Sequence, residues 1–303
     1  MALTRRHFIA TATAATAATL ATSRAWSGST LSLGDIRLDT LSDGHLVLPV
    51  SFSLGDVPAE QAAPILAKYG LGTDRLEPPC NLTLLRDGTN TVLFDVGSGP
   101  DFMPSAGKLM DAFDQLEITP DDITHVVFTH GHPDHLWGLL DDFDDLLFPD
   151  ATHMMGKAEF EYWMDPETVS TIARERTTMA VGARRRLEAI EDTITTFTDG
   201  EEILPGIAAR ATFGHTPGHM SFELAGGAMI VGDAIVNHHL AFERPEWRAG
   251  SDQDPDLGAR TRLRLLDQIA TEQVQIIGFH LPGGGIGRAE RSGDGYRFIA
   301  GDM

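Results

Sequence analysis

The chain has 303 residues, of which 42% are hydrophobic, so it can bury a sizeable core, and we see no repeat or linker that would mark a second domain. Its formal net charge of −21 disfavours nucleic acid and anionic membranes as partners, because both would repel such a surface. A single cysteine excludes an intrachain disulfide.

The N-terminus resembles a twin-arginine export signal. Arg5 and Arg6 precede a weakly hydrophobic run of Ala, Thr and Leu, and a small-residue cleavage pattern ends at Ala25. Threonines interrupt the run, which is short for a bilayer span, so we expect no stable membrane anchor. We predict a signal at residues 1–25, a single mature domain at residues 26–303, and export of the folded protein to a bacterial periplasm by the twin-arginine machinery.

The mature chain is predicted to mix strands and helices. Apolar and β-branched runs indicate strands at residues 30–38, 45–50, 81–86, 90–95, 123–128, 193–198, 207–213, 220–225, 227–232 and 274–277. Helical patterns occur at residues 105–116, 156–164, 167–190 and 256–271. Asp87-Gly88-Thr89-Asn90 is typical of a hairpin turn. Cys80, which follows Pro78-Pro79, is predicted to be a small buried residue rather than a nucleophile.

Residues 129–135 read Thr-His-Gly-His-Pro-Asp-His and directly follow a predicted strand. Gly131 and Pro133 prevent regular strand or helix here, so the side chains around them can converge on one point. The candidate metal ligands of this segment are His130, His132, Asp134 and His135. Nitrogen and oxygen donors suit Zn, Mn or Fe, and this ligand set excludes a sulfur site.

Further donors follow other predicted strands, namely Asp95, His215, Asp233 and His280. Together they exceed what one tetrahedral ion can use, so we expect two divalent metal ions, with Zn ahead of Mn or Fe.

Five other residues have competing interpretations. His219 lies in the same turn as His215 and is predicted to be structural. His238 and His239 are predicted to be a polar loop pair, with a place in the substrate pocket as the alternative. Trp163 either forms an aromatic wall of the substrate pocket or packs in the core, and His125 is expected to be a core histidine within its strand.

At these residues the chain resembles the metallo-β-lactamase superfamily, from about Gly34 onward, through the HxHxDH signature at residues 130–135. The resemblance implies an α/β fold, an αβ/βα sandwich of two mixed β-sheets flanked by helices. It implies a first metal held by His130, His132 and His215, and a second held by Asp134, His135 and His280. Asp233 would bridge the two ions, and Asp95 would orient the ligand loop.

Within the superfamily the chain is most similar to the exported branch of methyl parathion hydrolase and related lactonases. Asp233 disfavours the true β-lactamases, which generally lack a bridging acid there. The resemblance implies a hydrolase that uses a bridging hydroxide on an ester, lactone or phosphotriester, with Asp134 as the catalytic residue that orients the nucleophile and passes its proton to the leaving group.

Two alternatives stay open: a thiol-ester or persulfide hydrolase of a periplasmic sulfur-oxidation pathway, and a metal-binding scaffold without turnover. The expected partners are a small-molecule substrate and the export machinery, with a homodimer as a further alternative.

Overall fold

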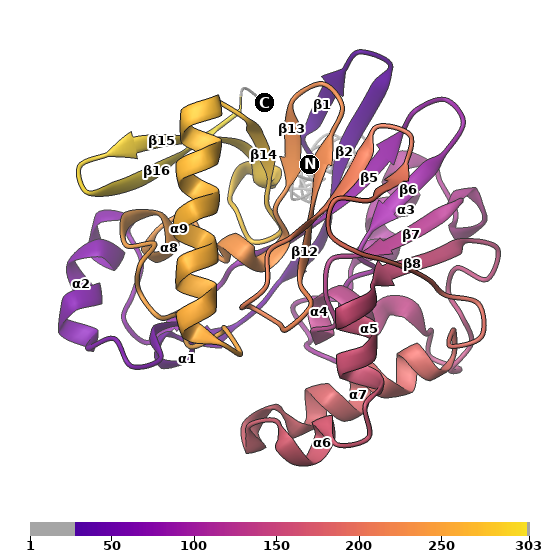
Figure 1. Ribbon diagram of the computed structural model, residues 1–303, viewed down its shortest axis with the longest axis horizontal. Coiled ribbons are helices and arrows are strands. Elements are labelled where there is room, and N and C mark those ends of the chain that lie inside the picture. Colours follow the sequence, from indigo (N-terminus) through magenta and orange to yellow (C-terminus); the bar gives the residue numbers. More distant parts are fainter. Residues whose placement is uncertain (1–27, 302–303) are drawn as a thin grey trace, which may run out of the picture.

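The computed structural model describes residues 28–301, so the predicted signal at residues 1–25 lies outside the described part. Two seven-stranded sheets face each other and helices cover their outer faces (Figure 1). The first sheet has the order β1-β2-β5-β6-β7-β8-β9 and the second the order β10-β11-β12-β13-β14-β15-β16. Both sheets are mixed, which confirms the predicted αβ/βα sandwich.

The first sheet contains the earlier part of the chain. Its strands are β1 (Thr30–Leu33), β2 (Ile36–His45), β5 (Pro79–Arg86), β6 (Thr91–Phe94), β7 (His125–Phe128), β8 (Thr152–Gly156) and β9 (Thr195–Phe197). Strands β6 to β9 run parallel, so their carboxyl ends meet at the same edge of the sheet. The predicted turn at residues 87–90 joins β5 to β6 as a hairpin.

The second sheet contains the later part. Its strands are β10 (Glu202–Leu204), β11 (Ile207–Ala211), β12 (Met220–Leu224), β13 (Ala228–Ile230), β14 (Gln275–Ile277), β15 (Ile286–Ser292) and β16 (Gly295–Ala300). Only β13 and β14 pair in parallel among these strands, and both end at the edge where β6 and β7 end on the other sheet.

The helices are α1 (Val50–Leu54), α2 (Ala59–Lys68), α3 (Leu109–Leu116), α4 (Pro133–Leu136), α5 (Lys157–Met164), α6 (Thr168–Thr171), α7 (Thr177–Glu188), α8 (Leu240–Glu243) and α9 (Pro255–Glu272). Helix α9 packs on the second sheet, and α3 and α5 pack on the first. The side chain of Asp254 caps α9 by accepting from Leu257 N, with Pro255 at the first helical position. None of the helices in residues 28–301 is long and apolar enough to cross a membrane.

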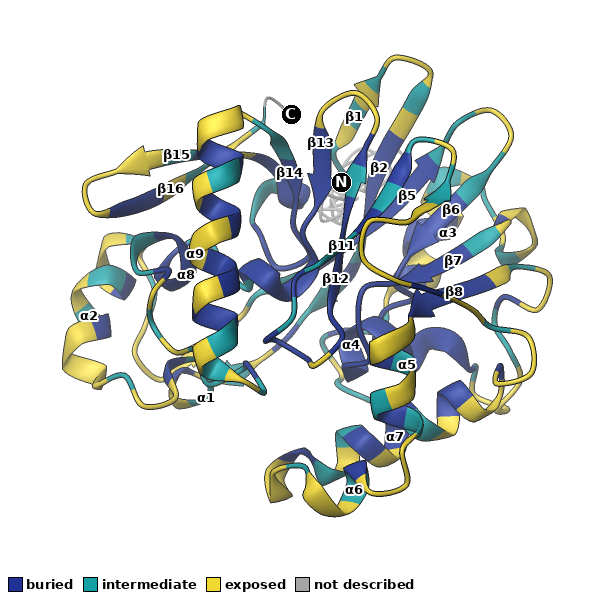
Figure 2. Ribbon diagram, in the orientation of Figure 1, coloured by how far each residue is buried: buried dark blue, intermediate teal, exposed yellow. Residues whose placement is uncertain are grey.

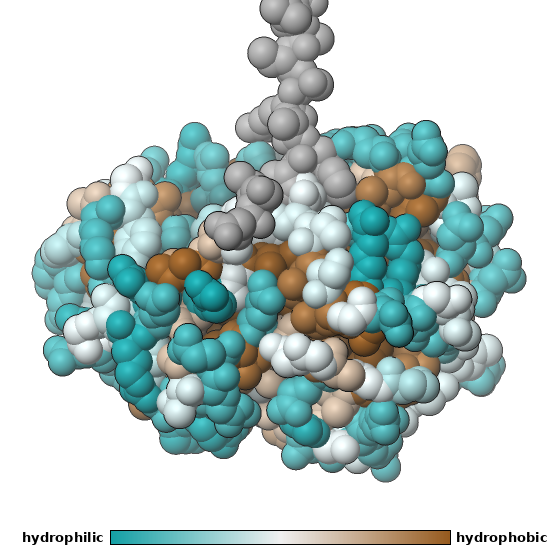
Figure 3. Space-filling model, turned by 90° about the horizontal axis from the view of Figure 1, so that it is seen from above, coloured by the Kyte–Doolittle hydropathy of each residue, from teal (hydrophilic) through white to brown (hydrophobic). Residues whose placement is uncertain are grey.

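The core fills both faces of the parallel strands. On β6, Val92 and Phe94 face the second sheet, whereas Leu93 faces the helices, and all three are buried. Phe94 meets Phe222 of β12 with ring centroids 5.1 Å apart. Figure 2 shows that β6, β7 and β8 are buried over most of their length, which explains the apolar runs at these positions of the sequence. In the view from above, hydrophobic residues gather in the middle and hydrophilic residues surround them (Figure 3).

Several predicted boundaries were wrong. The expected strand 30–38 is a hairpin, β1 and β2, that turns at Gly34 with φ +63°. The expected strand 45–50 is divided among the end of β2, the short strand β3 (Leu48–Pro49), which pairs with β4 (Arg75–Leu76), and the start of α1.

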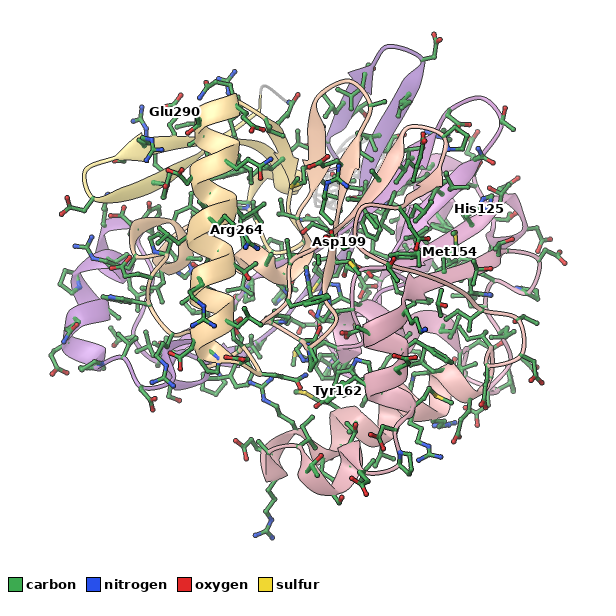
Figure 4. The ribbon with its side chains drawn as sticks, viewed as in Figure 1. His125, Met154, Tyr162, Asp199, Arg264 and Glu290 are labelled. Atoms are coloured by element: carbon green, nitrogen blue, oxygen red, sulfur yellow. The ribbon has the colours of Figure 1, made fainter. Side chains whose placement is uncertain are left out.

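The expected helix 167–190 is interrupted. It consists of α6, a 3-10 turn at Arg174–Arg176 and α7. Helix α2 and the β15–β16 hairpin have no counterpart in the prediction. His125 is not a core residue either, because it lies half-buried at the outer end of β7 (Figure 4).

Candidate metal centre

The structure brings all seven predicted ligands together at the edge where the parallel strands end. His130 and His132 follow β7, and Asp134 and His135 lie on α4. The second sheet contributes three more side chains: His215 from the loop after β11, Asp233 from the 3-10 turn Gly232–Ile235 after β13, and His280 after β14. All seven side chains are buried.

Three histidines converge as the first group of donors. His132 Nδ1 lies 3.0 Å from His130 Nε2 and 2.9 Å from His215 Nε2. Burial, followed by the neighbouring histidines, lowers the pKa of both His130 and His132 well below the usual value. Both rings are therefore neutral at neutral pH, which is the form that binds metal.

The second group consists of Asp134, His135 and His280. His280 Nε2 lies 3.2 Å from Asp134 Oδ2, and His135 Nε2 lies 3.5 Å from the same oxygen. Asp233 faces both groups, because its Oδ2 is 3.3 Å from His280 Nε2 and 3.3 Å from His215 Nε2. This is the position that a bridging carboxylate requires.

The donors fit two divalent ions. Asp134 Oδ2, His135 Nε2 and Asp233 Oδ1 are buried atoms that have no hydrogen-bond partner among the described residues. Buried polar atoms are nearly always paired, and His135 Nε2 lies 3.5 Å from Asp134 Oδ2 and 3.4 Å from Asp233 Oδ1. A cation among them would satisfy all three. Their role as ligands remains a prediction, which this geometry supports.

The outward ring nitrogens are held by the protein, which fixes the nitrogen that faces the metal position. His135 Nδ1 donates to Asp95 Oδ2 at 2.8 Å, and His280 Nδ1 donates to Pro79 O at 2.7 Å. Asp95 also accepts a hydrogen bond of 2.8 Å from the backbone N–H of Thr129, at the start of the ligand loop. Asp95 itself has an unusual backbone conformation, with φ +63°. Asp95 therefore lies where its predicted orienting role needs it.

His219 stands behind the donors rather than among them. Its Nδ1 is 2.8 Å from Thr212 Oγ1, and its Nε2 accepts the backbone N–H of Asp233 at 2.9 Å. Both nitrogens are therefore used within the protein. A Cβ on the neighbouring Gly232, where φ is +50°, would lie 2.7 Å from His219 Nε2, so the close approach requires glycine.

Glu159 is a buried carboxylate that the sequence reasoning missed. Its Oε1 accepts from Gly131 N at 2.8 Å and from Trp163 Nε1 at 2.6 Å. Its Oε2 accepts from Thr216 Oγ1 at 2.8 Å and from Gly218 N at 2.9 Å. Glu159 thus ties the loop of His130 and His132 to the loop of His215. Its spacing of four from Trp163, on one face of α5, was the available signal.

Asp252 is a second missed residue. Its Oδ1 lies 3.1 Å from His215 Nδ1, and its Oδ2 accepts two hydrogen bonds of 3.1 Å from the buried guanidinium of Arg262. The pair orients His215 from behind. No local motif marks it, because Asp252 lies in a loop and Arg262 lies inside α9.

The pocket-wall interpretation of Trp163 was wrong. Its side chain is only 1% exposed, donates to Glu159 and packs edge-on against His132 with ring centroids 6.0 Å apart. Its core-packing alternative is the one the structure supports, because the indole lies behind the ligand loop and not in the cavity.

A cavity opens directly onto the donors. Five of the predicted ligands line it: His132, Asp134, His215, Asp233 and His280. Apolar side chains form much of the remaining wall, including those of Leu46, Leu48, Phe52, Leu71, Leu76, Phe102, Met179 and Val236. His238 and His239 also line it, as their pocket alternative requires, and His238 meets the Tyr69 ring edge-on at 5.1 Å between centroids.

Cys80 lies closer to the centre than expected. Its Sγ is within 4.8 Å of donor atoms of Asp134 and His280, so a sulfur atom does border the second group of donors. Burial raises the pKa of the thiol to about 12, which keeps it protonated and a poor nucleophile in the metal-free protein. Cys80 is fully buried, as predicted.

Comparison with known proteins gives a family match over most of the chain. The sequence model of the metallo-beta-lactamase superfamily matches residues 76–272. A curated relative, the uncharacterized protein YobT of Bacillus subtilis (strain 168), is 28% identical over 159 residues, which are 52% of this chain and 62% of that protein. The match thus spans less than two thirds of the relative's length.

Three solved structures are similar in fold. The dizinc quorum-quenching lactonase AidC has a TM-score of 0.84 at 22% identity, covering 91% of this chain and 98% of that one. The hydrolase AbOPH of the beta lactamase superfamily has a TM-score of 0.83 at 27% identity, with the same coverage of 91% and 98%. A probable metal-dependent hydrolase from Staphylococcus aureus has a TM-score of 0.70 at 20% identity, covering 90% and 100%.

Proposed function

Because the chain belongs to the metallo-beta-lactamase superfamily, we propose that it is a metal-dependent hydrolase that opens a lactone or cleaves an ester or phosphotriester. The observation that carries this proposal is the group of buried donors that opens onto a largely apolar cavity. A scaffold without turnover would have no need to face its donors toward a largely apolar cavity.

When bound, two divalent ions supply Lewis-acid polarisation of the electrophile and activation of water near neutral pH. His130, His132 and His215 would hold one ion. Asp134, His135 and His280 would hold the other, and Asp233 would contact both. We keep Zn, Mn and Fe as candidates, because nitrogen and oxygen donors admit all three.

Asp134 contributes to the reaction as well as to the centre. Burial alone would raise the pKa of its carboxyl, but His135 and His280 outweigh burial and lower it. The carboxylate is therefore ionised at neutral pH and lines the cavity, where it can orient the attacking water and pass a proton toward the leaving group. The apolar wall would hold the acyl or aryl part of the substrate.

The test is an activity panel on metal-loaded mature protein with metal content quantified. The panel compares lactones, phosphotriesters, aryl esters and glutathione thioesters, each with and without chelator. We expect chelator-sensitive turnover with a preference for lactones or phosphotriesters. Preference for the thioester would favour the thiol-ester alternative, turnover by stripped protein would contradict the metal mechanism, and no turnover at full metal content would favour the scaffold.

We also propose that the protein is periplasmic and exported in the folded state. The paired Arg5 and Arg6 support this, and so does a metal centre that is assembled by folding. Cell fractionation with N-terminal sequencing of the mature protein tests it. Retention in the cytoplasm of the wild type, or unchanged export of the Arg5→Lys, Arg6→Lys double variant, would contradict the proposal.

A further inference from the structure

A buried arginine lines the cavity beside the metal donors. Arg176 ends the 3-10 turn Arg174–Arg176 in front of α7 and is only 7% exposed. It shares the cavity wall with His132 and His215.

The guanidinium is held by neutral partners. Nη1 donates to Ser251 O at 3.0 Å, and Nη2 donates to Gly250 O at 2.7 Å and to Asp252 O at 3.4 Å. Within residues 28–301 no acidic side chain forms an ion pair with it, and the charges of Asp252 and Glu175 act on it from beyond ion-pair distance. The carboxylate of Asp252 is already used by His215 and Arg262.

A buried cation without an anionic partner is costly. An arginine has five N–H donors, and those hydrogen bonds leave Nε–H and one Nη1–H without a protein acceptor. The positive charge is retained, because a guanidinium cannot lose its proton in a protein. The cavity therefore offers a preformed site for an anionic group next to the reaction centre.

We infer that Arg176 binds a carboxylate of the substrate. The inference rests on the proposed hydrolase function and adds that, for a given type of scissile bond, a substrate with a free carboxylate is preferred over its neutral analogue. The free Nε–H can donate to one carboxylate oxygen, and the ring of Phe52, whose centroid is 6.0 Å from the guanidinium carbon, belongs to the apolar wall on which the rest of the substrate would pack. A neutral phosphotriester or an unsubstituted lactone would leave Arg176 without this partner.

A purely structural role makes a different prediction. If Arg176 only clamps residues 250–252, its removal would disturb Asp252 and therefore His215, and all substrates would lose turnover together with metal. A carboxylate-binding role predicts a loss confined to substrates that carry the carboxylate. Substrates that differ only in the carboxylate distinguish the structural role from the carboxylate-binding role.

The experiment compares S-(phenylacetyl)-3-mercaptopropionate with its carboxamide analogue. Metal-loaded enzyme is assayed by the free thiol that hydrolysis releases, and the comparison is repeated with a matching pair of aryl esters.

The variant Arg176→Met removes the charge. Arg174→Met removes the same charge from an exposed residue of the same turn and is the control. We expect Arg176→Met to lower kcat/KM for the acid by about tenfold or more, mainly through KM, and to leave the amide within about twofold. Arg174→Met should change neither.

Equal losses for acid and amide, or an unchanged acid-to-amide ratio, would overturn the inference. Thermal unfolding checks the fold, and Arg176→Gln replaces Arg176→Met if the latter does not fold, because its amide can still donate to a carbonyl. If the wild type hydrolyses neither pair, the hydrolase proposal fails for this class of substrate. Arg176 is then tested by calorimetric binding of S-benzyl-3-mercaptopropionate and its amide, and an acid preference that is the same in wild type and variant would overturn the inference.

Discussion

Among residues 28–301, Asp233 is the carboxylate that faces both groups of donors, and its backbone N–H donates to His219. Asp233→Ala should release at least one metal ion and reduce turnover by orders of magnitude. His219→Ala keeps the carboxylate but removes the acceptor behind it, so we expect a loss of about 10- to 100-fold in metal affinity or activity. The number of metal ions per chain, from mass spectrometry, and kcat test the predictions for both variants. Equal metal loss in the two variants would mean that His219 is itself a ligand.

Glu159 connects the two ligand loops through four hydrogen bonds, which a glutamine cannot all accept. Glu159→Gln should weaken metal binding by about 10- to 100-fold and lower the melting temperature. Glu161→Gln, an exposed change on the same helix, is the matched control and should behave as wild type. Chelator competition and thermal unfolding measure the two effects. Wild-type affinity in Glu159→Gln would show that the loops hold their positions without this carboxylate.

The ring pKa values of His135 and His280 determine how metal binding depends on pH. Burial alone would lower both, but the nearby carboxylates, Asp233 first, raise the pKa of His135 to about 10 and that of His280 well above its usual value. In the metal-free protein both rings hold a proton at neutral pH, and each must lose it before binding a cation. Metal affinity should therefore rise with pH, by up to about tenfold per pH unit for each proton released. Chelator competition across neutral and mildly alkaline pH tests this, and a flat profile would contradict it.

At the scale of elements, the ligand loop depends on the small size of Gly131. A Cβ there would lie 2.3 Å from Trp163 Nε1, the atom that donates to Glu159. Gly131→Ala should displace the loop between His130 and His132 and reduce metal content and turnover by at least about tenfold. Gly72→Ala, where the added Cβ meets only the side chain of Asp74, is the control. Full metal content in Gly131→Ala would show that α5 can shift without cost to the centre.

The ligands could be predicted because each follows an apolar strand, and parallel strands bring their ends together. The break between α6 and α7 could not be predicted from the sequence. Ile172, with ψ 152°, leaves the helical conformation although its residue type does not demand it, and the turn that follows delivers Arg176 to the carbonyls of residues 250–252. This is a tertiary contact that overrides local propensity. Gly34 with Asp35 is a turn signal, but the strand-like residues on both sides of it favour one continuous strand.

The residues around the ligands were missed for a related reason. Glu159 accepts from Gly218, 59 positions away, and Arg176 reaches Gly250, 74 positions away. Such contacts leave no periodicity in the sequence, because each depends on how two separate loops fold against each other. Only the pairing of Glu159 with Trp163 on one helical face was local enough to detect.

At the scale of the whole molecule, the centre joins the two sheets. His130 to His135 come from the first sheet, and His215, Asp233 and His280 come from the second. Removing metal should therefore lower the melting temperature of the whole domain rather than loosen one loop. With free metal about 100-fold above its Kd, binding raises the free energy of unfolding by about 2.7 kcal/mol, which raises the melting temperature by about 5–10 °C for a chain of this size. Calorimetry with and without chelator tests this. In Asp233→Ala the chelator should change the melting temperature by less than in the wild type. Identical melting curves would contradict it.

The spread of the ligands along the chain also sets an order of events in time. A growing polypeptide presents His130, His132, Asp134 and His135 long before His280 is synthesised. At that stage a metal ion could bind only these four residues, because His215, Asp233 and His280 belong to the second sheet, which has not yet been synthesised. If both metal sites are complete only after the second sheet has folded, the metal ions available in the compartment where folding ends would determine which ions are bound.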